Sequence, residues 1–461
     1  MQTAKTMKKE RITFFLMLVS IIFLSSCSNK EDVENSFKIT VTPTTLTMKM
    51  GETAIITVNN APEDAEILWK SSDEKVAKID NGKVEALEKG TAVITVIAKK
   101  GDISSDAQCN ITIEENPQYN SINFTDAYLK QRLLDIPGLD ANKDGNISVK
   151  EAQTIHKLNF SYAVGENTTD ANTIKSLEGL QYFVNLDTLT LNYHKVSDTT
   201  PISKLDKLSQ LHIGGNLIKS IDVSNLKELR DLRVFKCEIE ELNLANNSKL
   251  QILDIHNTNI KKLDFTPLKE LVTIVARTTK LTSVNLTDMP KLTGIDLRQG
   301  VLEEFIAHNL PQIEKLYIEQ NQISRLELSN LPELQHLVAY ENKITKIDFD
   351  LPKLMFLTVY DNRISYADFS KMPMLFRCYI SNNLLNKIDF SSNKLIAQLE
   401  ILQMPNLEVI NLKNDNFMDA HEYDILYNNP KLSRIHVDAG EEETYVRELT
   451  TNFPNIIIDT N

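Results

Sequence analysis

A repeat of 21 residues governs the second half of this 461-residue chain. The leucine or isoleucine that opens each unit recurs every 21 residues, at Leu208, Leu229, Leu250, Leu271, Leu292, Ile313 and Leu334. Leu354 comes one residue early, and Leu375 restores the spacing. One complete unit, residues 313–333, reads IEKLYIEQNQISRLELSNLPE and contains two L-x-L pieces. Each piece would direct two side chains inward and one outward, so the repeat predicts a β-solenoid with short turns.

The unit template, LxxLxLxxNxIxxLxLSNLPx, resembles the leucine-rich repeat family, in particular a bacterial class with 21-residue repeats. We predict such repeats over residues 166–412. The resemblance implies that an inward asparagine at the ninth position bonds the backbone of neighbouring turns, with cysteine and threonine as its usual substitutes. This position holds Asn216, Cys237, Thr258, Thr279, Gly300, Asn321, Asn342, Asn362 and Asn383. Cys237 therefore has a structural explanation, and Cys378 falls on an inward leucine position.

The repeat is predicted to break after Phe390. Ile396, Leu399 and Ile401 fit the second half of a unit whose first half is missing, so we expect a kink or bulge there. Residues 413–461 lose the period and are predicted to cap the last turn, with a helix near residues 442–451 and a strand at 456–458.

The outward residues of the first L-x-L piece should form the concave sheet of the solenoid. The units at 229–300 place charged residues there, whereas those at 313–381 place aromatic residues, namely Tyr317, Tyr340, Phe356, Tyr360 and Tyr379. Strands lie about 4.8 Å apart, so these rings would share one patch. Exposed aromatics beside arginine are typical of binding hot spots, which predicts a site for a protein or glycan ligand. The alternative is that aromatic residues occupy the sheet because β-structure favours them.

The second L-x-L piece carries a mainly acidic column of outward residues. Its members are Asp222, Asn243, Asp264, Asn285, Ile306, Glu327, Asp348, Asp368, Asp389 and Glu400. Acids at repeat spacing could hold cations. We favour the alternative that they accept hydrogen bonds from backbone groups and from the serine or threonine two residues on.

Residues 37–115 alternate apolar and polar side chains in short runs such as FKITVTP and TAVITVIAKK, divided by turn residues. This pattern predicts an all-β sandwich, with Asn81-Gly82 as a hairpin turn. The pieces WKSS (69–72), GKV (82–84) and GTA (90–92) resemble the bacterial immunoglobulin-like domain of group 2. Trp69 is expected to anchor the core rather than stack on a sugar. We expect the domain to act as a spacer rather than as a binding module.

Residues 118–165 are predicted to form a small helical cap for the solenoid, with helices near 124–134 and 149–158. Within it, residues 140–151 read DANKDGNISVKE, which has the spacing of an EF-hand calcium loop. The predicted Ca²⁺ ligands are Asp140, Asn142, Asp144, Asn146, Ser148 and Glu151, and the ion would be structural. Alternatively, Ser148 and Glu151 form only a helix capping box.

The first 26 residues are predicted to be a lipoprotein signal peptide. A basic segment precedes the apolar run ITFFLMLVSIIFL, which is too short for a membrane span of about 20 residues. The sequence Leu24-Ser25-Ser26-Cys27 resembles the bacterial lipoprotein signal, in which Cys27 is lipidated; the alternative is an ordinary signal peptide. Residues 27–36 would be an acidic tether, similar to those of surface lipoproteins of the Bacteroides group. The resemblance implies anchoring to the outer membrane by lipid alone, with exposure at the cell surface.

The formal charge of −13 argues against nucleic acid as a partner. No G-x-S-x-G, P-loop, dinucleotide or H-x-x-x-H motif is present, so we expect a protein that is not an enzyme. Three hypotheses remain: a cell-surface module for protein binding or adhesion, a glycan-binding lipoprotein, and a structural envelope protein. We favour the first.

Overall fold

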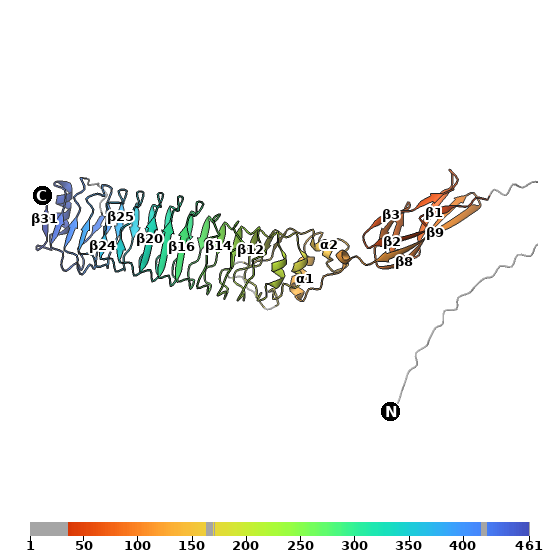
Figure 1. Cartoon of the computed structure of the whole chain (residues 1–461), viewed down its shortest axis with the longest axis horizontal. Helices are drawn as coiled ribbons and strands as arrows, with labels where there is room; N and C mark the ends of the chain where they lie inside the picture. Colours follow the sequence, from red (N-terminus) through yellow and green to blue (C-terminus); the bar gives the residue numbers. More distant parts are fainter. Residues whose placement is uncertain (1–35, 163–168, 170, 416–421, 461) are drawn as a thin grey trace, which may run out of the picture. The chain divides into compact units, whose positions relative to one another are not determined.

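The computed structural model describes residues 36–162, 169, 171–415 and 422–460 (Figure 1). The chain divides into two compact units, Met1–Asn116 and Pro117–Asn461. The predicted signal peptide and Cys27 lie outside the described residues. Within the described ranges, no helix has the length and apolar character needed to cross a membrane.

The first unit is an all-β sandwich. Its strands are β1 (Thr40–Thr42), β2 (Thr45–Lys49), β3 (Thr53–Ile55), β4 (Thr57–Asn59), β5 (Glu66–Ser71), β6 (Ala77–Asp80), β7 (Lys83–Ala86), β8 (Gly90–Lys100) and β9 (Ile103–Glu114). They pair as β2-β9-β8-β5, β3-β7-β6 and β1-β4. Val84, Val96 and Ile111 lie in the buried core, which draws on both larger sheets.

The predicted hairpin turn of this unit is confirmed, and Trp69 lies at the margin of the core. Asn81 and Gly82 both have positive φ, 47° and 84°, and form the two-residue turn between paired strands β6 and β7. Trp69 packs against the core while its ring stays partly exposed. A Cβ atom at Gly82 would lie only 2.7 Å from the Ile56 carbonyl oxygen and 3.3 Å from the Trp69 ring, so this turn needs glycine.

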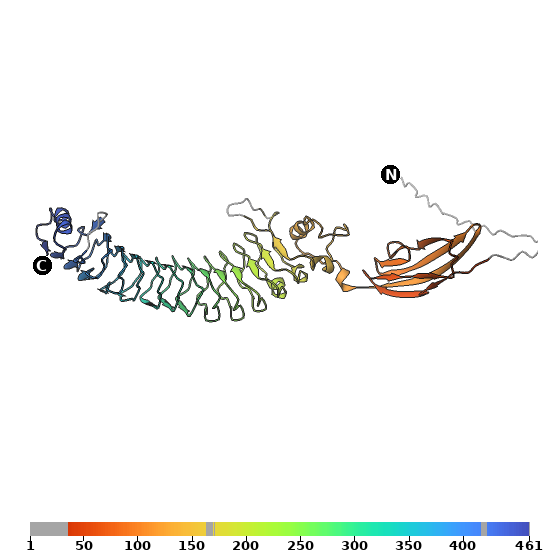
Figure 2. The same ribbon diagram turned by 90° about the horizontal axis from the view of Figure 1, so that it is seen from above.

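The second unit is a β-solenoid built on one parallel sheet of 13 strands. In spatial order the strands are β10 (Lys157–Asn159), β11 (Thr188–Thr190), β12 (Gln210–His212), β13 (Asp231–Arg233), β14 (Ile252–Asp254), β15 (Thr273–Val275), β17 (Gly294–Asp296), β19 (Lys315–Tyr317), β21 (His336–Val338), β23 (Phe356–Thr358), β25 (Arg377–Tyr379), β27 (Gln398–Glu400) and β29 (Glu422–Asp424). Figure 2 shows the turns stacked in a gently curved row. The middle residue of each strand is buried, including Cys378, which occupies a leucine position as predicted.

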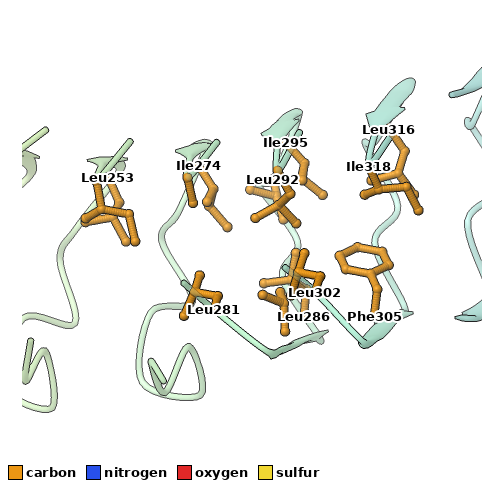
Figure 3. Close-up of a cluster of buried hydrophobic side chains, with 14 of the residues drawn as sticks. Leu253, Ile274, Leu281, Leu286, Leu292, Ile295, Leu302, Phe305, Leu316 and Ile318 are labelled. Atoms are coloured by element: carbon orange, nitrogen blue, oxygen red, sulfur yellow. The ribbon is translucent and has the colours of Figure 1, made fainter. Parts of the chain in front are cut away.

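A second series of strands, each of two to five residues, faces the 13-stranded sheet across the core. It comprises β16 (Ser283–Thr287), β18 (Glu304–His308), β20 (Arg325–Ser329), β22 (Lys346–Ile347), β24 (Tyr366–Ala367), β26 (Lys387–Asp389), β28 (Val409–Asn411), β30 (Arg434–His436) and β31 (Ile457–Asp459). We call these the opposite strands. Figure 3 shows Ile295 and Leu316 of the 13-stranded sheet above Leu286 and Phe305 of the opposite strands, so the two L-x-L pieces close one apolar core.

The region before the repeats contains fewer helical residues than expected. It holds a short 3-10 turn, η1 (Pro117–Tyr119), and the helices α1 (Ala127–Leu134) and α2 (Val149–Ala152). The helix predicted at 149–158 ends at Ala152, and residues 157–159 form β10 instead. Leu158 is buried opposite Leu189 in the parallel register, so the sheet begins before residue 166.

The predicted break after Phe390 is wrong. Ile396 lies 21 residues after Leu375 and opens a complete unit, in which Leu399 of β27 pairs in register with Cys378 of β25. Glu400 therefore belongs to the 13-stranded sheet, beside Tyr379, and not to the acidic column. The ninth position of this unit holds Met404 instead of asparagine, which removed the clearest sign of the repeat.

Both series of strands also continue beyond residue 412, through β29, β30 and β31. The predicted C-terminal helix and strand are present as α3 (Glu441–Leu449) and β31 (Ile457–Asp459). Val446 of α3 joins the solenoid core.

Asparagine side chains link successive turns at the ninth position. Asn342 Nδ2 donates to the Ile318 carbonyl oxygen of the preceding turn at 3.1 Å, and its Oδ1 accepts from Ile323 N at 2.9 Å. Thr258 at the same position donates only to Ile255 within its own turn. Two buried asparagines outside this position, Asn247 and Asn393, also donate to carbonyls of preceding turns. The sequence reading missed them because they replace an apolar residue of the template.

Glu442 makes the stability of the C-terminal region sensitive to pH. Its side chain is buried and accepts hydrogen bonds from Asp438 N at 2.8 Å and the Tyr423 hydroxyl at 3.4 Å. Burial raises the pKa of Glu442 to about 7 from 4.5. Because the folded-state pKa is the higher one, the free energy of unfolding should fall as the pH rises from 4.5 to about 7.

Glu442→Gln should remove the contribution of this residue to the pH dependence of stability. Between pH 4.5 and about 7, the free energy of unfolding of the variant should fall by up to about 3 kcal/mol less than that of the wild-type protein. Urea unfolding of the wild-type protein and the variant at both ends of the pH range measures it. Equal pH profiles would contradict the assignment to Glu442.

Candidate functional site

The outward face of the 13-stranded sheet presents three columns of side chains. The first column consists of the first residue of each strand, and the second column consists of the last residue of each strand. The third column consists of the residue two positions after the end of each strand. In β19, for example, these residues are Lys315, Tyr317 and Glu319. The parallel register aligns Asp296, Tyr317 and Val338 on neighbouring strands of the second column. The outward residues of the first L-x-L piece therefore line one face of the sheet, as the repeat spacing predicts.

In the half of this face from β12 to β17, three aspartates each lie beside a basic side chain. The ion pairs are Arg233 Nε with Asp231 Oδ1 at 2.9 Å and Arg298 Nε with Asp296 Oδ1 at 2.8 Å. Two histidines also contact aspartates, His212 Nε2 with Asp231 Oδ2 at 3.0 Å and His256 Nδ1 with Asp254 Oδ1 at 2.6 Å. Burial raises the pKa of Asp231, but the hydrogen bonds and charges of His212 and Arg233 outweigh burial and hold it below its ordinary value.

The half from β19 to β25 carries the five predicted aromatic residues. All five are half-buried and face outward from adjacent strands. Tyr340 and Tyr360 stack in the third column, with ring centroids 4.6 Å apart and an interplanar angle of 11°. Phe356 stacks instead on His336 in the first column, at 4.4 Å and 20°. The single predicted patch is thus two stacked pairs on opposite sides of the second column.

Tyr317 and Tyr379 lie in the second column, and arginines cover both rings. The Arg298 guanidinium lies 5.6 Å from the centroid of Tyr317, and that of Arg377 lies 5.4 Å from Tyr379 and 5.3 Å from Phe356. Such cation–π contacts hold the rings in defined positions and lower the entropy that binding would cost. The repeat spacing places His336 in the first column, but its stacking on Phe356 is visible only in the structure.

A hollow of about 410 Å³ opens beside the aromatic residues. Gly294 of the first column lines it, together with Asp296, Arg298, Lys315 and Tyr317. A Cβ atom at Gly294 would meet nothing closer than Thr273, at 3.5 Å. The absence of a side chain at Gly294 therefore leaves open space on the face.

Gly214, in the third column, shows that a missing side chain is not enough to make a hollow. A Cβ atom there would lie 2.6 Å from the Phe235 ring, which fills the space above the glycine. We expect Gly214→Ala to lower the free energy of unfolding by about 1–3 kcal/mol through overpacking. Gly294→Ala should stay within about 0.5 kcal/mol of the wild-type protein. Urea unfolding compares the two variants, and equal losses would contradict the difference in space.

The acidic column on the opposite strands is occupied by local hydrogen bonds. Asp222, Asp264 and Asp368 each accept from the backbone N–H two residues on, at 2.9, 2.9 and 3.0 Å. Hydrogen bonds from Lys346 and Lys371 hold the pKa of Asp348 at about 2. These contacts agree with the hydrogen-bonding interpretation of the acidic column.

The predicted calcium loop closes through its own hydrogen bonds. Asp140 accepts from the N–H groups of Asp144 and Gly145, at 3.2 and 3.0 Å, and Asp144 accepts from Asn146 N at 2.7 Å. Ser148 and Glu151 form the capping box of α2. Across the described ranges, no three His, Cys, Asp or Glu side chains gather in a way that would hold a metal ion. The helix-capping alternative is thus present, and calcium binding stays a prediction.

Comparisons with known proteins agree with the architecture of the first unit. Residues 37–109 match the model of the bacterial Ig-like domain (group 2). A lacto-N-biosidase of Bifidobacterium bifidum is 38% identical over 76 residues, which are 16% of this chain and 7% of that protein. The chain therefore spans less than a tenth of that relative.

Solved structures similar to the chain include two from Listeria monocytogenes. The functional domain of InlJ is 18% identical with a TM-score of 0.48, over 67% of this chain and 74% of the other. The internalin InlF is 21% identical with a TM-score of 0.40, over 69% and 96%. The leucine-rich effector YopM of Yersinia pestis is 23% identical with a TM-score of 0.41, over 68% and 82%. By its own sequence and strands, the chain carries a bacterial Ig-like domain of group 2 at residues 37–109, followed by a β-solenoid of leucine-rich repeats.

Proposed function

We propose that this chain is a non-catalytic surface lipoprotein that binds a protein ligand on the outward face of its 13-stranded sheet. The observation that carries the proposal is the aromatic half of the face: five half-exposed rings on adjacent strands, beside a hollow of about 410 Å³. Tyrosine combines a large contact area with a polar hydroxyl, and arginine held over a ring supplies directed charge. Charges of both signs border these rings, which suits a protein surface better than a neutral glycan.

A screen of a random peptide display library and a glycan array against the purified chain tests this function. We expect retention of peptides, and loss of that retention in Tyr317→Ala, because Tyr317 borders both the hollow and the rings. Tyr366→Ala is the matched control, since Tyr366 is 51% exposed on β24 among the opposite strands. Glycans retained in place of peptides would support the glycan alternative. If neither library is retained, the proposed function is wrong.

The anchor is part of the same proposal. Lipidated Cys27, followed by the tether of residues 27–36, would hold the folded units at the outer membrane with the binding face accessible from outside the cell. Labelling of expressing cells with an alkyne-bearing fatty acid should mark the wild-type chain and leave Cys27→Ser unmarked. Equal labelling of the two proteins would contradict lipidation at this residue.

We also propose that calcium occupies the loop at residues 140–151, as a structural ion. A lone extracellular site of this kind binds at about 10⁻⁴–10⁻³ M, so millimolar calcium should add about 1 kcal/mol to the free energy of unfolding. Thermal melts with EDTA and with millimolar calcium measure the shift. Asp144→Asn keeps an acceptor for Asn146 N but removes a charged ligand, so it should abolish the shift. Identical melts of the wild-type protein in both buffers would exclude a bound structural ion.

A further inference from the structure

Charges around the aromatic half of the sheet are segregated by sign. Lys315 and Arg377 occupy the first column, on either side of the His336–Phe356 pair. Four carboxylates lie around the Tyr340–Tyr360 pair. Glu319, Glu341 and Asp361 lie at the third-column edge, whereas Glu400 lies in the second column beside Tyr379. Two charges depart from this division, namely Glu314, which acts on His336, and Arg298, which pairs with Asp296. The remaining charges make the first-column edge cationic and the third-column edge acidic.

Most of these charges lack a charged partner within the described part of the chain. Neither Lys315 nor Arg377 forms an ion pair there, and Arg377 Nε donates to neutral Gln398 at 2.6 Å. The hydrogen-bond partners of Glu341, Asp361 and Glu400 are likewise neutral: Gln320, Asn382 and Ser381. In the half from β12 to β17, Asp231, Asp254 and Asp296 each have a basic partner. The aromatic half therefore differs in that most of its carboxylates have only neutral hydrogen-bond partners.

Glu319 is a buried carboxylate whose hydrogen bonding is incomplete. This residue is 4% exposed, and its Oε1 lies 3.7 Å from Arg298 Nε. Its Oε2 is buried and has no hydrogen-bond partner in the described structure. A buried acceptor without a donor is unfavourable, and burial raises the pKa of Glu319. A cation on the Tyr340 ring, which the charge of Glu319 affects, would stabilise the Glu319 carboxylate.

The neighbouring carboxylates affect the pKa of both tyrosines in the Tyr340–Tyr360 pair. Burial, the neighbouring Tyr340 phenol and the charges of Glu341, Asp361 and Glu400 raise the pKa of Tyr360 to about 12. Burial and the charge of Glu319 raise the pKa of Tyr340 as well. Both phenols therefore stay neutral at physiological pH, and their stacked rings form an electron-rich surface bordered by carboxylates.

We propose that the aromatic half binds a protein segment that places a lysine or arginine on the Tyr340–Tyr360 pair and a carboxylate against Lys315 and Arg377. The first and third columns are four residues apart along the strands, which is about 13 Å. A partner would match this separation with a base and an acid about four residues apart in an extended segment or about nine apart in a helix. The inference rests on the proposed function and names its partner class.

Peptides retained from the random library on the wild-type chain test this assignment. The retained pool should be enriched in peptides that carry both a basic and an acidic residue, and salt should weaken their binding. Fluorescence polarisation then gives the Kd of one retained peptide. Glu341→Gln/Glu400→Gln should weaken binding about tenfold, and Lys315→Met/Arg377→Met by a similar factor. Glu303→Gln/Glu327→Gln is the control, because it removes the same two negative charges as Glu341→Gln/Glu400→Gln but on the other side of the solenoid. Glu303 directly precedes β18, and Glu327 lies in β20.

The outcomes separate this inference from the proposed function. If Tyr340→Ala/Tyr360→Ala abolishes binding but the charge variants leave Kd unchanged, the face binds and the partner class is wrong. Equal weakening by the control pair would also overturn the inference, because bulk charge would then be the cause. Light scattering that shows a dimer of the chain, dissociated by Lys315→Met/Arg377→Met, would replace the partner segment with a second copy. Retention of no peptide at all would overturn the proposed function too.

Discussion

Asn383→Ala is expected to lower the free energy of unfolding by about 3 kcal/mol, because it would leave several buried backbone groups without partners. Asn383 is 1% exposed. Its Nδ2 donates to Val359 O at 3.0 Å and Ile380 O at 2.9 Å, and its Oδ1 accepts from Ile364 N at 2.8 Å. Two of these three partners belong to the preceding turn, so the side chain holds adjacent turns together.

Two matched variants make this test of Asn383 specific. Asn383→Thr should lose less stability, because threonine at this position in the chain still donates to its own turn, as Thr279 does to Ala276 at 2.9 Å. Asn386→Ala, at an exposed position of the same turn, should stay within about 0.5 kcal/mol of the wild-type protein. Urea unfolding measures all three. An Asn383→Ala variant as stable as Asn386→Ala would refute the role of the asparagine in linking turns.

Tyr340→Ala/Tyr360→Ala is expected to weaken binding of a retained peptide at least about a hundredfold, as two adjacent hot-spot residues would. The two rings stack on each other, so a single substitution at either tyrosine would also disturb the ring of the other. For this reason both are replaced together. Neither residue is in the buried core, so the fold should persist with a loss of stability of about 1 kcal/mol or less. Calorimetric titration gives the affinities, and Tyr366→Ala should bind as the wild-type protein does. Equal affinities for all three proteins would contradict the assignment of the face.

The repeat spacing predicted most of the solenoid because each apolar position fixes a register. Leu337 or Leu357 can be inward only if their neighbours face outward, and the parallel pairing then aligns the columns. The prediction failed where the unit lost its ninth-position asparagine, at Met404, although the 21-residue spacing from Leu375 to Ile396 persisted. Spacing was the more reliable guide, because a core tolerates a change of one polar side chain more readily than a change of register.

The details of the site depend on side-chain conformations that a sequence pattern does not contain. Gly214 and Gly294 look alike in the columns, yet the Phe235 ring fills the space at one and the other stays open. Likewise, Arg298 pairs with Asp296, whereas Arg377 lies over Phe356 and Tyr379 without an acidic partner among the described residues. The sequence could place these charges on one face, but their pairing follows from geometry.

Site-specific photo-crosslinking tests most directly whether the outward face of the 13-stranded sheet is the binding surface. A photoreactive residue at Thr358, in the second column between the two stacked pairs, should crosslink to a retained peptide. The same residue at Ile306, on β18 among the opposite strands, should give no product. Crosslinking at Ile306 with none at Thr358 would show that the partner binds the other side of the solenoid and would contradict the account.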